Sequence, residues 1–172
     1  MESNPPNASG FVAAVLARVK TDNNKERAFR AIMSRADNPA FESLAWEYLI
    51  PYCNINNDFE RIPFALIGAA IARIRPDQNG TADIGESLSS ICKDDGDKER
   101  ESRRFRRLIA CDSVLELCPL LHSVLSYLAS KGAAIDYIRL LMDLLYWNQK
   151  TKLRWAVSFY GKSAPAEEES QS

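Results

Sequence analysis

The sequence predicts an all-α protein, a compact bundle of about eight or nine helices. Apolar residues recur every three or four positions through most of the chain, and no segment alternates in the manner of a half-buried strand. Only 7 glycines and 8 prolines occur, many of the prolines at the ends or in turns, which leaves long stretches where helices can run. With 172 residues, 46% of them hydrophobic, the chain is long enough for one domain with a real core.

One helical domain over residues 10–160 is expected between two disordered ends. Residues 1–9 are rich in proline and asparagine, and residues 161–172 form a polar, acidic tail. Apolar stripes between turn and capping residues define the helices of the domain. The expected helices cover about residues 10–20, 25–35, 40–49, 58–75, 83–91, 100–111, 114–130, 135–147 and 150–160.

Polar residues and prolines set the boundaries in the first half of the chain. Ser9 is expected to cap the first helix, and Asn38-Pro39 marks the start of the third, because proline suits a first turn. Pro51 ends that helix. The fourth helix accommodates Pro63 only if this residue lies in its first turn, and Pro76 stops it.

Capping residues and a glycine set the boundaries in the second half. The charged residues 93–98 predict a mobile connection to the sixth helix. Asp112 and Ser113 are expected to cap the leucine-rich seventh helix, and Gly132 to end it. The last two helical segments are either separate or joined through a kink near Asn148.

The charges of the chain are segregated. The net charge is −1, which excludes a globally basic nucleic-acid binder, so any attraction to phosphate must come from local concentrations of cations. From Arg100 to Arg154 there are 10 lysines and arginines but only 5 acids, and acids concentrate instead in residues 94–99 and 167–169. A basic surface on one part of the protein is therefore expected.

No set of residues predicts catalysis, a cofactor or a metal site. The four cysteines form no C-x-x-C pair and His122 is the single histidine, which favours reduced, mostly buried thiols over zinc ligands. Gly161-Lys162-Ser163 is not a phosphate-binding loop, because Ala156 stands where that motif requires glycine and no helix follows. We expect a protein that is not an enzyme and has no small-molecule substrate.

The N-terminus lacks the basic segment and apolar run of a secretory signal. No run approaches the roughly 18 apolar residues that span a membrane. Cysteines without a disulfide framework agree with a reducing compartment. A cytoplasmic location without membrane contact is therefore expected.

The most informative stretch is the helix predicted around residues 100–109. At about 100° per residue its arginines spread over an arc of roughly 160°, opposite Phe105, Leu108 and Ile109. These arginines are Arg100, Arg103, Arg104, Arg106 and Arg107, with Glu101 as the one neighbouring carboxylate. Such a face repels itself unless an anion neutralises it, and the planar guanidinium matches phosphate well.

Two further helices carry clusters of cations. These are Lys25, Arg27, Arg30 and Arg35 on the second helix, and Lys150, Lys152 and Arg154 on the last. Lys150 and Arg154 share a face and would add a basic patch beside the arginine helix if the last helix packs there. Together the three helices predict an extended surface that tracks a phosphate backbone.

Three other interpretations of the arginine stretch remain open. In many ordinary helices a stretch of this kind is simply a charged face exposed to solvent. It would also suit a helical protein–protein interaction module whose arginines bind an acidic partner. A helix-turn-helix transcription regulator is the weakest alternative, because no second helix follows a short glycine-containing turn.

From about Phe11 to Tyr160 the sequence resembles the small subunit of the type I-E CRISPR surveillance complex Cascade, the CasB family. The resemblance is carried by residues 103–112, 135–137 and 140–147, by Lys150, Lys152, Arg154, Trp155 and Phe159, and upstream by residues 22–23, 27–30, 38–41 and 84–88. These motifs are arginine and tryptophan positions at set distances and include no catalytic signature.

The resemblance implies a non-catalytic, all-helical subunit without cofactors. In this family two copies stack along the belly of the complex, contact the large subunit and the backbone subunits, and help hold target DNA unwound by the guide RNA, particularly the displaced strand. The implied nucleic-acid contacts are Arg27, Arg30, Arg103, Arg104, Arg106, Arg107, Lys150, Lys152 and Arg154, with Lys25, Arg35, Arg73, Arg75, Arg100 and Arg139 as further candidates. The acidic tail and the near-neutral total charge depart from the family pattern and argue against strong DNA affinity of the isolated protein, though not against a role within the complex.

Overall fold

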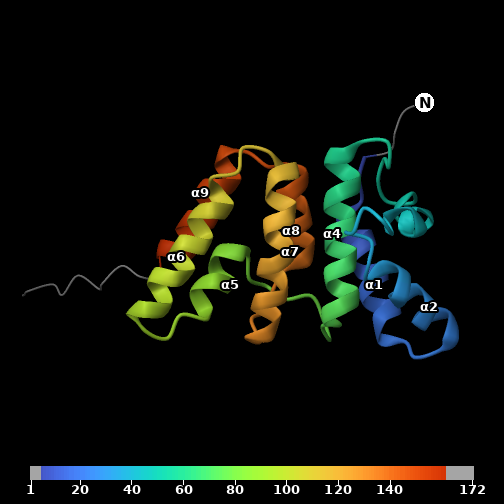
Figure 1. The fold of residues 1–172 in the computed structure, drawn as a ribbon, viewed down its shortest axis with the longest axis horizontal. Coiled ribbons are helices and arrows are strands. Elements are labelled where there is room, and N and C mark those ends of the chain that lie inside the picture. Colours follow the sequence, from blue (N-terminus) through green and yellow to red (C-terminus); the bar gives the residue numbers. More distant parts are fainter. Residues whose placement is uncertain (1–4, 162–172) are drawn as a thin grey trace, which may run out of the picture.

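A computed structural model describes residues 5–161, and these residues form nine α-helices, one 3₁₀ helix and no strand (Figure 1). The predicted all-α fold class is confirmed. The helices are α1 (Ala8–Lys20), α2 (Asn24–Met33), η1 (Glu42–Ala45, 3₁₀), α3 (Trp46–Leu49), α4 (Asp58–Ile74), α5 (Ile84–Ser90), α6 (Asp95–Ile109), α7 (Val114–Ser130), α8 (Tyr137–Leu145) and α9 (Gln149–Tyr160).

α4 occupies the middle of an elongated molecule (Figure 1). It packs against α1 and α2 on one side and against α7 and α8 on the other, and α5, α6 and α9 form the far end. Every residue from Pro63 to Ala72 is buried. At Gly68 an added Cβ would lie 2.6 Å from Met33 Sδ and 2.9 Å from Phe11, so the absence of a side chain lets α1 and α2 approach α4 closely.

Two helices begin earlier than predicted because of the residues that cap them. Asn7 caps α1 in place of Ser9, since its side chain accepts a hydrogen bond from Gly10 N at 2.9 Å. Asp94 caps α6 by accepting from Asp97 N at 2.8 Å. Residues 95–98, predicted as a mobile connection, are therefore the first turn of α6.

The prediction that the fourth helix accommodates Pro63 only in its first turn was wrong. α4 begins at Asp58, so Pro63 lies in its second turn, where its nitrogen cannot donate to the Phe59 carbonyl. Pro119 lies equally deep in α7, which starts at Val114. In both helices the burial of the following turns offsets the loss of one backbone hydrogen bond.

The remaining boundaries differ only slightly from prediction. The third predicted helix divides into η1 and α3. α8 and α9 are separate helices, and Asn148 caps the second of them by accepting from Thr151 N at 3.1 Å. Gly132 follows α7 with a φ of 70°, the left-handed conformation that glycine adopts easily.

Residues 1–4 and 162–172 lie outside the described residues, so the disorder expected there stays a prediction. Within the segment 1–9 that was expected to be disordered, Asn7 donates to the Tyr52 carbonyl at 2.8 Å, and Ala8 and Ser9 belong to α1. Within residues 5–161 no helix has both the length and the apolar character that crossing a membrane requires.

Candidate nucleic-acid interface

An apolar stripe fixes one side of α6 against the rest of the protein. Phe105 and Leu108 are buried, and Phe105 stacks on Phe159 of α9 with ring centroids 4.7 Å apart. α6 also packs against α5 and α7. Because this side is held, the side chains on the other sides of α6 have defined positions at the surface.

Glu101 lies on the buried side of α6, with 1% of its side chain exposed. Its carboxylate accepts hydrogen bonds from the Tyr127 hydroxyl at 2.7 Å, from Arg104 at 2.5 Å and from Arg100 Nε at 3.2 Å. A buried carboxylate is tolerated when charged and hydroxyl donors surround it in this way. Glu101 therefore fixes two of the five arginines and joins α6 to α7.

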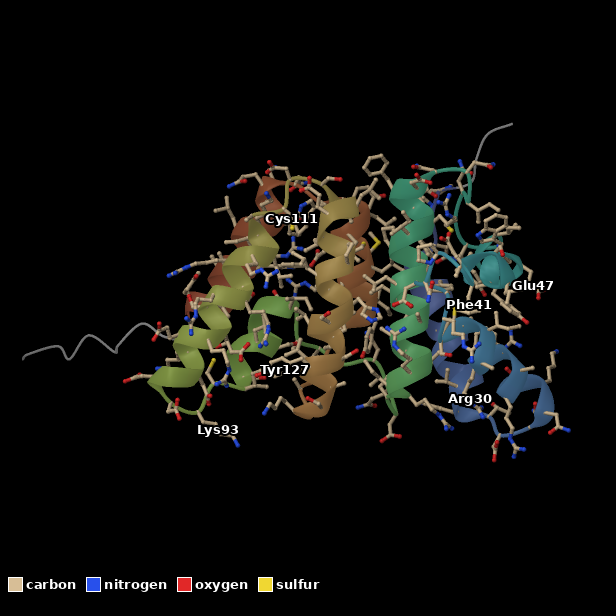
Figure 2. All side chains as sticks on the ribbon, in the orientation of Figure 1. Arg30, Phe41, Glu47, Lys93, Cys111 and Tyr127 are labelled. Atoms are coloured by element: carbon tan, nitrogen blue, oxygen red, sulfur yellow. The ribbon has the colours of Figure 1, made fainter. Side chains whose placement is uncertain are left out.

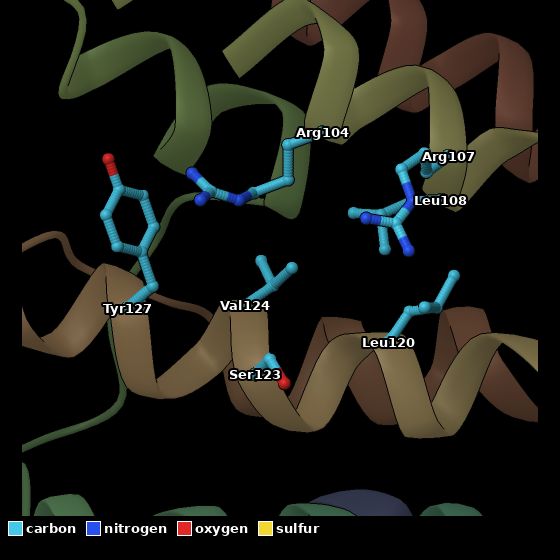
Figure 3. Close-up of a pocket in the computed structure, with 7 residues that line it drawn as sticks. All are labelled: Arg104, Arg107, Leu108, Leu120, Ser123, Val124 and Tyr127. Atoms are coloured by element: carbon cyan, nitrogen blue, oxygen red, sulfur yellow. The ribbon is translucent and has the colours of Figure 1, made fainter. Parts of the chain in front are cut away.

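The five arginines consequently do not form the single outward face that the sequence predicted. Arg104 turns toward α7, where its guanidinium carbon lies 3.9 Å from the centroid of the Tyr127 ring (Figure 3). Arg100 also donates to Asp97 at 2.5 Å, and its hydrogen bonds to Asp97 and Glu101 raise the pKa of Arg100. Both side chains have internal partners.

Arg103, Arg106 and Arg107 are the arginines of α6 that remain open to a ligand, and we call them the α6 arginine surface. All three are exposed. Their side chains form no hydrogen bond or ion pair with any residue in the described range 5–161. They lie within about 6 Å of helix rise, so their positive charges reinforce one another.

Two hollows flank the α6 arginine surface. One, of about 230 Å³, lies between α6 and α7, with Arg104 and Arg107 facing Val124 across it (Figure 3). The other, of about 580 Å³, lies where α5, α6 and α9 meet, and Arg106 and Tyr160 line it. The arginines thus stand on a ridge with an indentation on each side.

α9 packs beside α6, as the predicted second basic patch requires. Most of the cations of α9, however, are paired with acids. Lys152 lies 3.3 Å from Asp112, just beyond the end of α6. Arg154 forms an ion pair with the buried Asp143. Lys150 is exposed and forms no ion pair within the described part of the chain. Of the predicted patch, Lys150 alone resembles the α6 arginines in being open to a ligand.

The cations of α2 lie at the opposite end of the molecule from α6 (Figures 1 and 2). Arg27 donates to Asp22 at 2.9 Å, which lowers the pKa of Asp22, and Arg30 lies 3.7 Å from the same carboxylate. Arg35 lies over the ring of Phe41, and Lys25 is exposed. The three basic helices therefore do not form the one extended surface expected from the sequence.

The other candidate arginines hold elements of the fold together. Arg73 donates two hydrogen bonds to Asp37, at 2.9 and 3.0 Å, and the same carboxylate contacts His122 Nδ1 at 2.6 Å. Arg75 donates to the Val19 carbonyl at 3.3 Å, and Arg139 lies 4.0 Å from Asp83. Figure 2 shows how side chains like these fill the spaces between the ribbons.

The described residues contain no group of three or more His, Cys, Asp or Glu side chains placed to hold a metal ion. The four cysteines are free thiols. Burial raises the pKa of Cys53 and of Cys118 to about 12, which disfavours the reactive thiolate at both positions.

Sequence reasoning missed Glu101, Tyr127 and Asp143, the residues that fix the arginines and Trp155. The signal for Glu101 was present, because Glu101, Phe105 and Leu108 are spaced i, i+4, i+7 and so share the buried stripe. Tyr127 and Asp143 each contact a residue on a neighbouring helix. Helical periodicity alone does not identify such partners.

Comparisons with known proteins agree on one family. The sequence model described as CRISPR-associated protein Cse2 matches residues 12–160. A crystal structure of CasB from Thermus thermophilus superposes with a TM-score of 0.71 at 21% identity, covering 91% of this chain and 99% of that one. A second crystal structure from Thermus thermophilus, of a CRISPR-associated protein of the Cse2 family, gives 0.69 at 21%, with the same coverage. No curated protein matches the chain.

Proposed function

The chain belongs to the CRISPR-associated Cse2 (CasB) family of Cascade subunits, and from that premise we propose that its α6 arginine surface binds nucleic-acid backbone. The protein acts without catalysis and stabilises target DNA that the guide RNA has unwound, chiefly the displaced strand. It does so beside the large and backbone subunits of Cascade and a second copy of itself.

The observation that carries this proposal is a set of three exposed arginines on an anchored helix that have no partner among residues 5–161. Arg103, Arg106 and Arg107 are held close together although they repel one another. Phosphate oxygens relieve that repulsion and accept hydrogen bonds from the planar guanidinium. Because Glu101 and Phe105 hold α6 in place, little entropy is lost when a strand binds.

The charge pattern also fits a protein that does not recognise the base sequence of its DNA ligand. In RNA-guided recognition base pairing identifies the target, so a protein subunit needs only cations against the backbone. Contacts of that kind give binding that weakens steeply with salt.

The test measures the affinity for a labelled mixed-sequence single-stranded DNA as salt is varied. We expect R103A/R106A/R107A to bind more weakly and its log–log salt slope to fall by roughly one for each arginine that had bound a phosphate. The matched control is K20A/K25A/R35A, which removes the same three charges from the other end of the molecule. Circular dichroism checks that both variants remain helical.

Each outcome of this comparison decides between interpretations. An unchanged slope in the α6 variant would exclude the α6 arginine surface as the binding site. Equal losses in the two variants would overturn the assignment to the α6 arginine surface, because overall charge or the candidate contacts Lys25 and Arg35 would then attract DNA equally well. If the wild type does not retain DNA even at low salt, but binds an acidic protein partner through the same arginines, the surface is a protein-interaction site.

A further inference from the structure

The described chain ends next to the α6 arginine surface. α9 finishes at Tyr160, whose hydroxyl lies 3.4 Å from Ser102 Oγ and whose ring centroid lies 5.6 Å from that of Phe105. Tyr160 and Arg106 line the same hollow of about 580 Å³. Whatever follows Gly161 therefore leaves the fold beside α6.

The sequence that follows carries the opposite charge. Residues 162–172 contain three consecutive acids, Glu167, Glu168 and Glu169, and one cation, Lys162. The three arginines of the α6 arginine surface have no anionic partner within the described part of the chain. Carboxylate and phosphate offer guanidinium the same planar pair of acceptor oxygens, so the acids suit the surface proposed for DNA.

The length of the connection allows this contact. Five residues lie between Gly161 and Glu167, so the six steps from one to the other span up to about 20 Å when extended. From Ser102 to Arg107 the rise along α6 is only about 7.5 Å. A tether this short gives the acids an effective concentration on the order of millimolar at the surface.

The charges around the hollow favour the C-terminal part of α6. Glu99 and Lys98 line the same hollow as Arg106, and Asp95 and Asp97 lie in the first turn of α6, so acids outnumber cations there. These acids repel a glutamate that approaches the start of the helix. The attraction is therefore strongest over Arg103 to Arg107.

From these observations we infer that Glu167, Glu168 and Glu169 bind the α6 arginine surface of their own chain and compete with nucleic-acid phosphate for it. The inference rests on the proposed function, because it assigns a regulation to that same surface. A single phosphate group gains little by displacing the tail. A nucleic-acid strand that contacts the surface through several phosphates displaces the tail. The tail therefore suppresses weak, nonspecific binding of anions to the subunit.

The first measurement is direct and needs no DNA. Backbone amide NMR spectra of the full chain and of E167Q/E168Q/E169Q are compared at about 50 mM and about 500 mM salt. We expect the amide signals of residues 102–107 to differ between the two proteins at low salt and to coincide at high salt. Identical spectra over α6 at low salt would overturn the inference.

The second measurement compares DNA affinities with a matched control. If the tail occupies the surface about 90% of the time, E167Q/E168Q, which keeps Glu169, binds single-stranded DNA up to roughly tenfold more tightly than wild type at low salt. The control E47Q/D77N removes two exposed acids that lie outside α6 and α9 and should leave affinity nearly unchanged. A gain of equal size in both variants would show an effect of net charge and overturn the inference.

The two measurements separate failure of the inference from failure of the proposed function. If the full chain binds DNA through the α6 arginine surface but neutralising the tail changes neither spectra nor affinity, the tail inference fails alone. If no variant binds DNA at low salt, the proposed function fails, and the competition inferred from it fails as well. The NMR comparison then still reports whether the tail contacts α6.

Discussion

The hydroxyl of Tyr127 on α7 donates a hydrogen bond of 2.7 Å to the buried carboxylate of Glu101 on α6. The same carboxylate holds Arg104, which in turn stacks on the Tyr127 ring. Glu101, Arg104 and Tyr127 thus form a closed set of three contacts across the α6–α7 boundary. This set fixes the rotation of α6 and so determines which arginines face outward.

Replacing Glu101 by glutamine should destabilise the protein by about 2 kcal/mol. A neutral amide binds the guanidinium groups of Arg100 and Arg104 less strongly, and its NH₂ group finds no acceptor on either guanidinium. The control is Glu99→Gln on the exposed side of the same helix, which should change the free energy of unfolding by less than about 0.5 kcal/mol. Urea unfolding followed by circular dichroism gives both values. Equal effects at the two positions would contradict the role assigned to Glu101.

Arg104 and Arg107 are three residues apart on α6 but should respond differently to replacement by alanine. Arg104→Ala removes the hydrogen bond to Glu101 and the contact with Tyr127, so stability should fall by about 1–3 kcal/mol. Arg107→Ala removes no internal partner within the described residues, so stability should hold while the DNA salt slope falls by roughly one. Unfolding and salt titrations of both variants check this. If Arg104→Ala leaves stability unchanged, the internal role of Arg104 is refuted.

Much of the fold followed from local patterns in the sequence. The apolar stripes of α4 and α7 and the stop at Gly132 depend on residues within a few positions of one another, and these predictions agree with the structure. Errors arose where two caps competed, because Asn7 and Ser9 are both good capping residues. Local propensity does not decide which of two adjacent caps is used.

The site was less predictable because its arginines differ only in their tertiary partners. Arg103 and Arg104 are adjacent and chemically identical, yet Arg104 contacts Glu101 and Tyr127 while Arg103 points to the surface. The position of Glu101 on the buried stripe was a usable signal. The ion pair of Arg154 with Asp143 depends on how α8 and α9 pack, which periodicity does not reveal.

Gly85 should tolerate no side chain, because α5 and α9 meet at this residue. A Cβ added there would lie 2.1 Å from the Trp155 carbonyl oxygen and 3.0 Å from Phe159 N, and backbone atoms do not move as easily as side chains. We expect Gly85→Ala to cost about 2–3 kcal/mol of unfolding free energy. In the control Gly96→Ala the added Cβ meets only Asp94 Oδ1, at 3.3 Å, so stability should stay within about 0.5 kcal/mol of wild type. A similar loss in both variants would show that helical glycines, and not this contact, matter.

Asp143 should make the protein less stable as the pH rises from about 4. Its carboxylate accepts from Trp155 Nε1 at 2.7 Å and pairs with Arg154, yet burial outweighs both and raises the pKa of Asp143 above its usual value. Between the unfolded and folded pKa values the folded protein binds more protons than the unfolded chain. The stability from this group is therefore fully present below the unfolded pKa and is lost as pH rises through the folded pKa.

The variant Asp143→Asn isolates this effect, since asparagine keeps an acceptor oxygen for Trp155 but does not titrate. The free energy of unfolding of wild type minus that of the variant should decrease as the pH rises from about 4 through the folded pKa of Asp143, and then level off. Urea unfolding of both proteins, followed by tryptophan fluorescence at several pH values, measures this difference. A difference that grows with pH would mean that the ion pair with Arg154 outweighs the cost of burying the charge. In that case Asp143 would act chiefly as the partner that holds Arg154 in place beside α8.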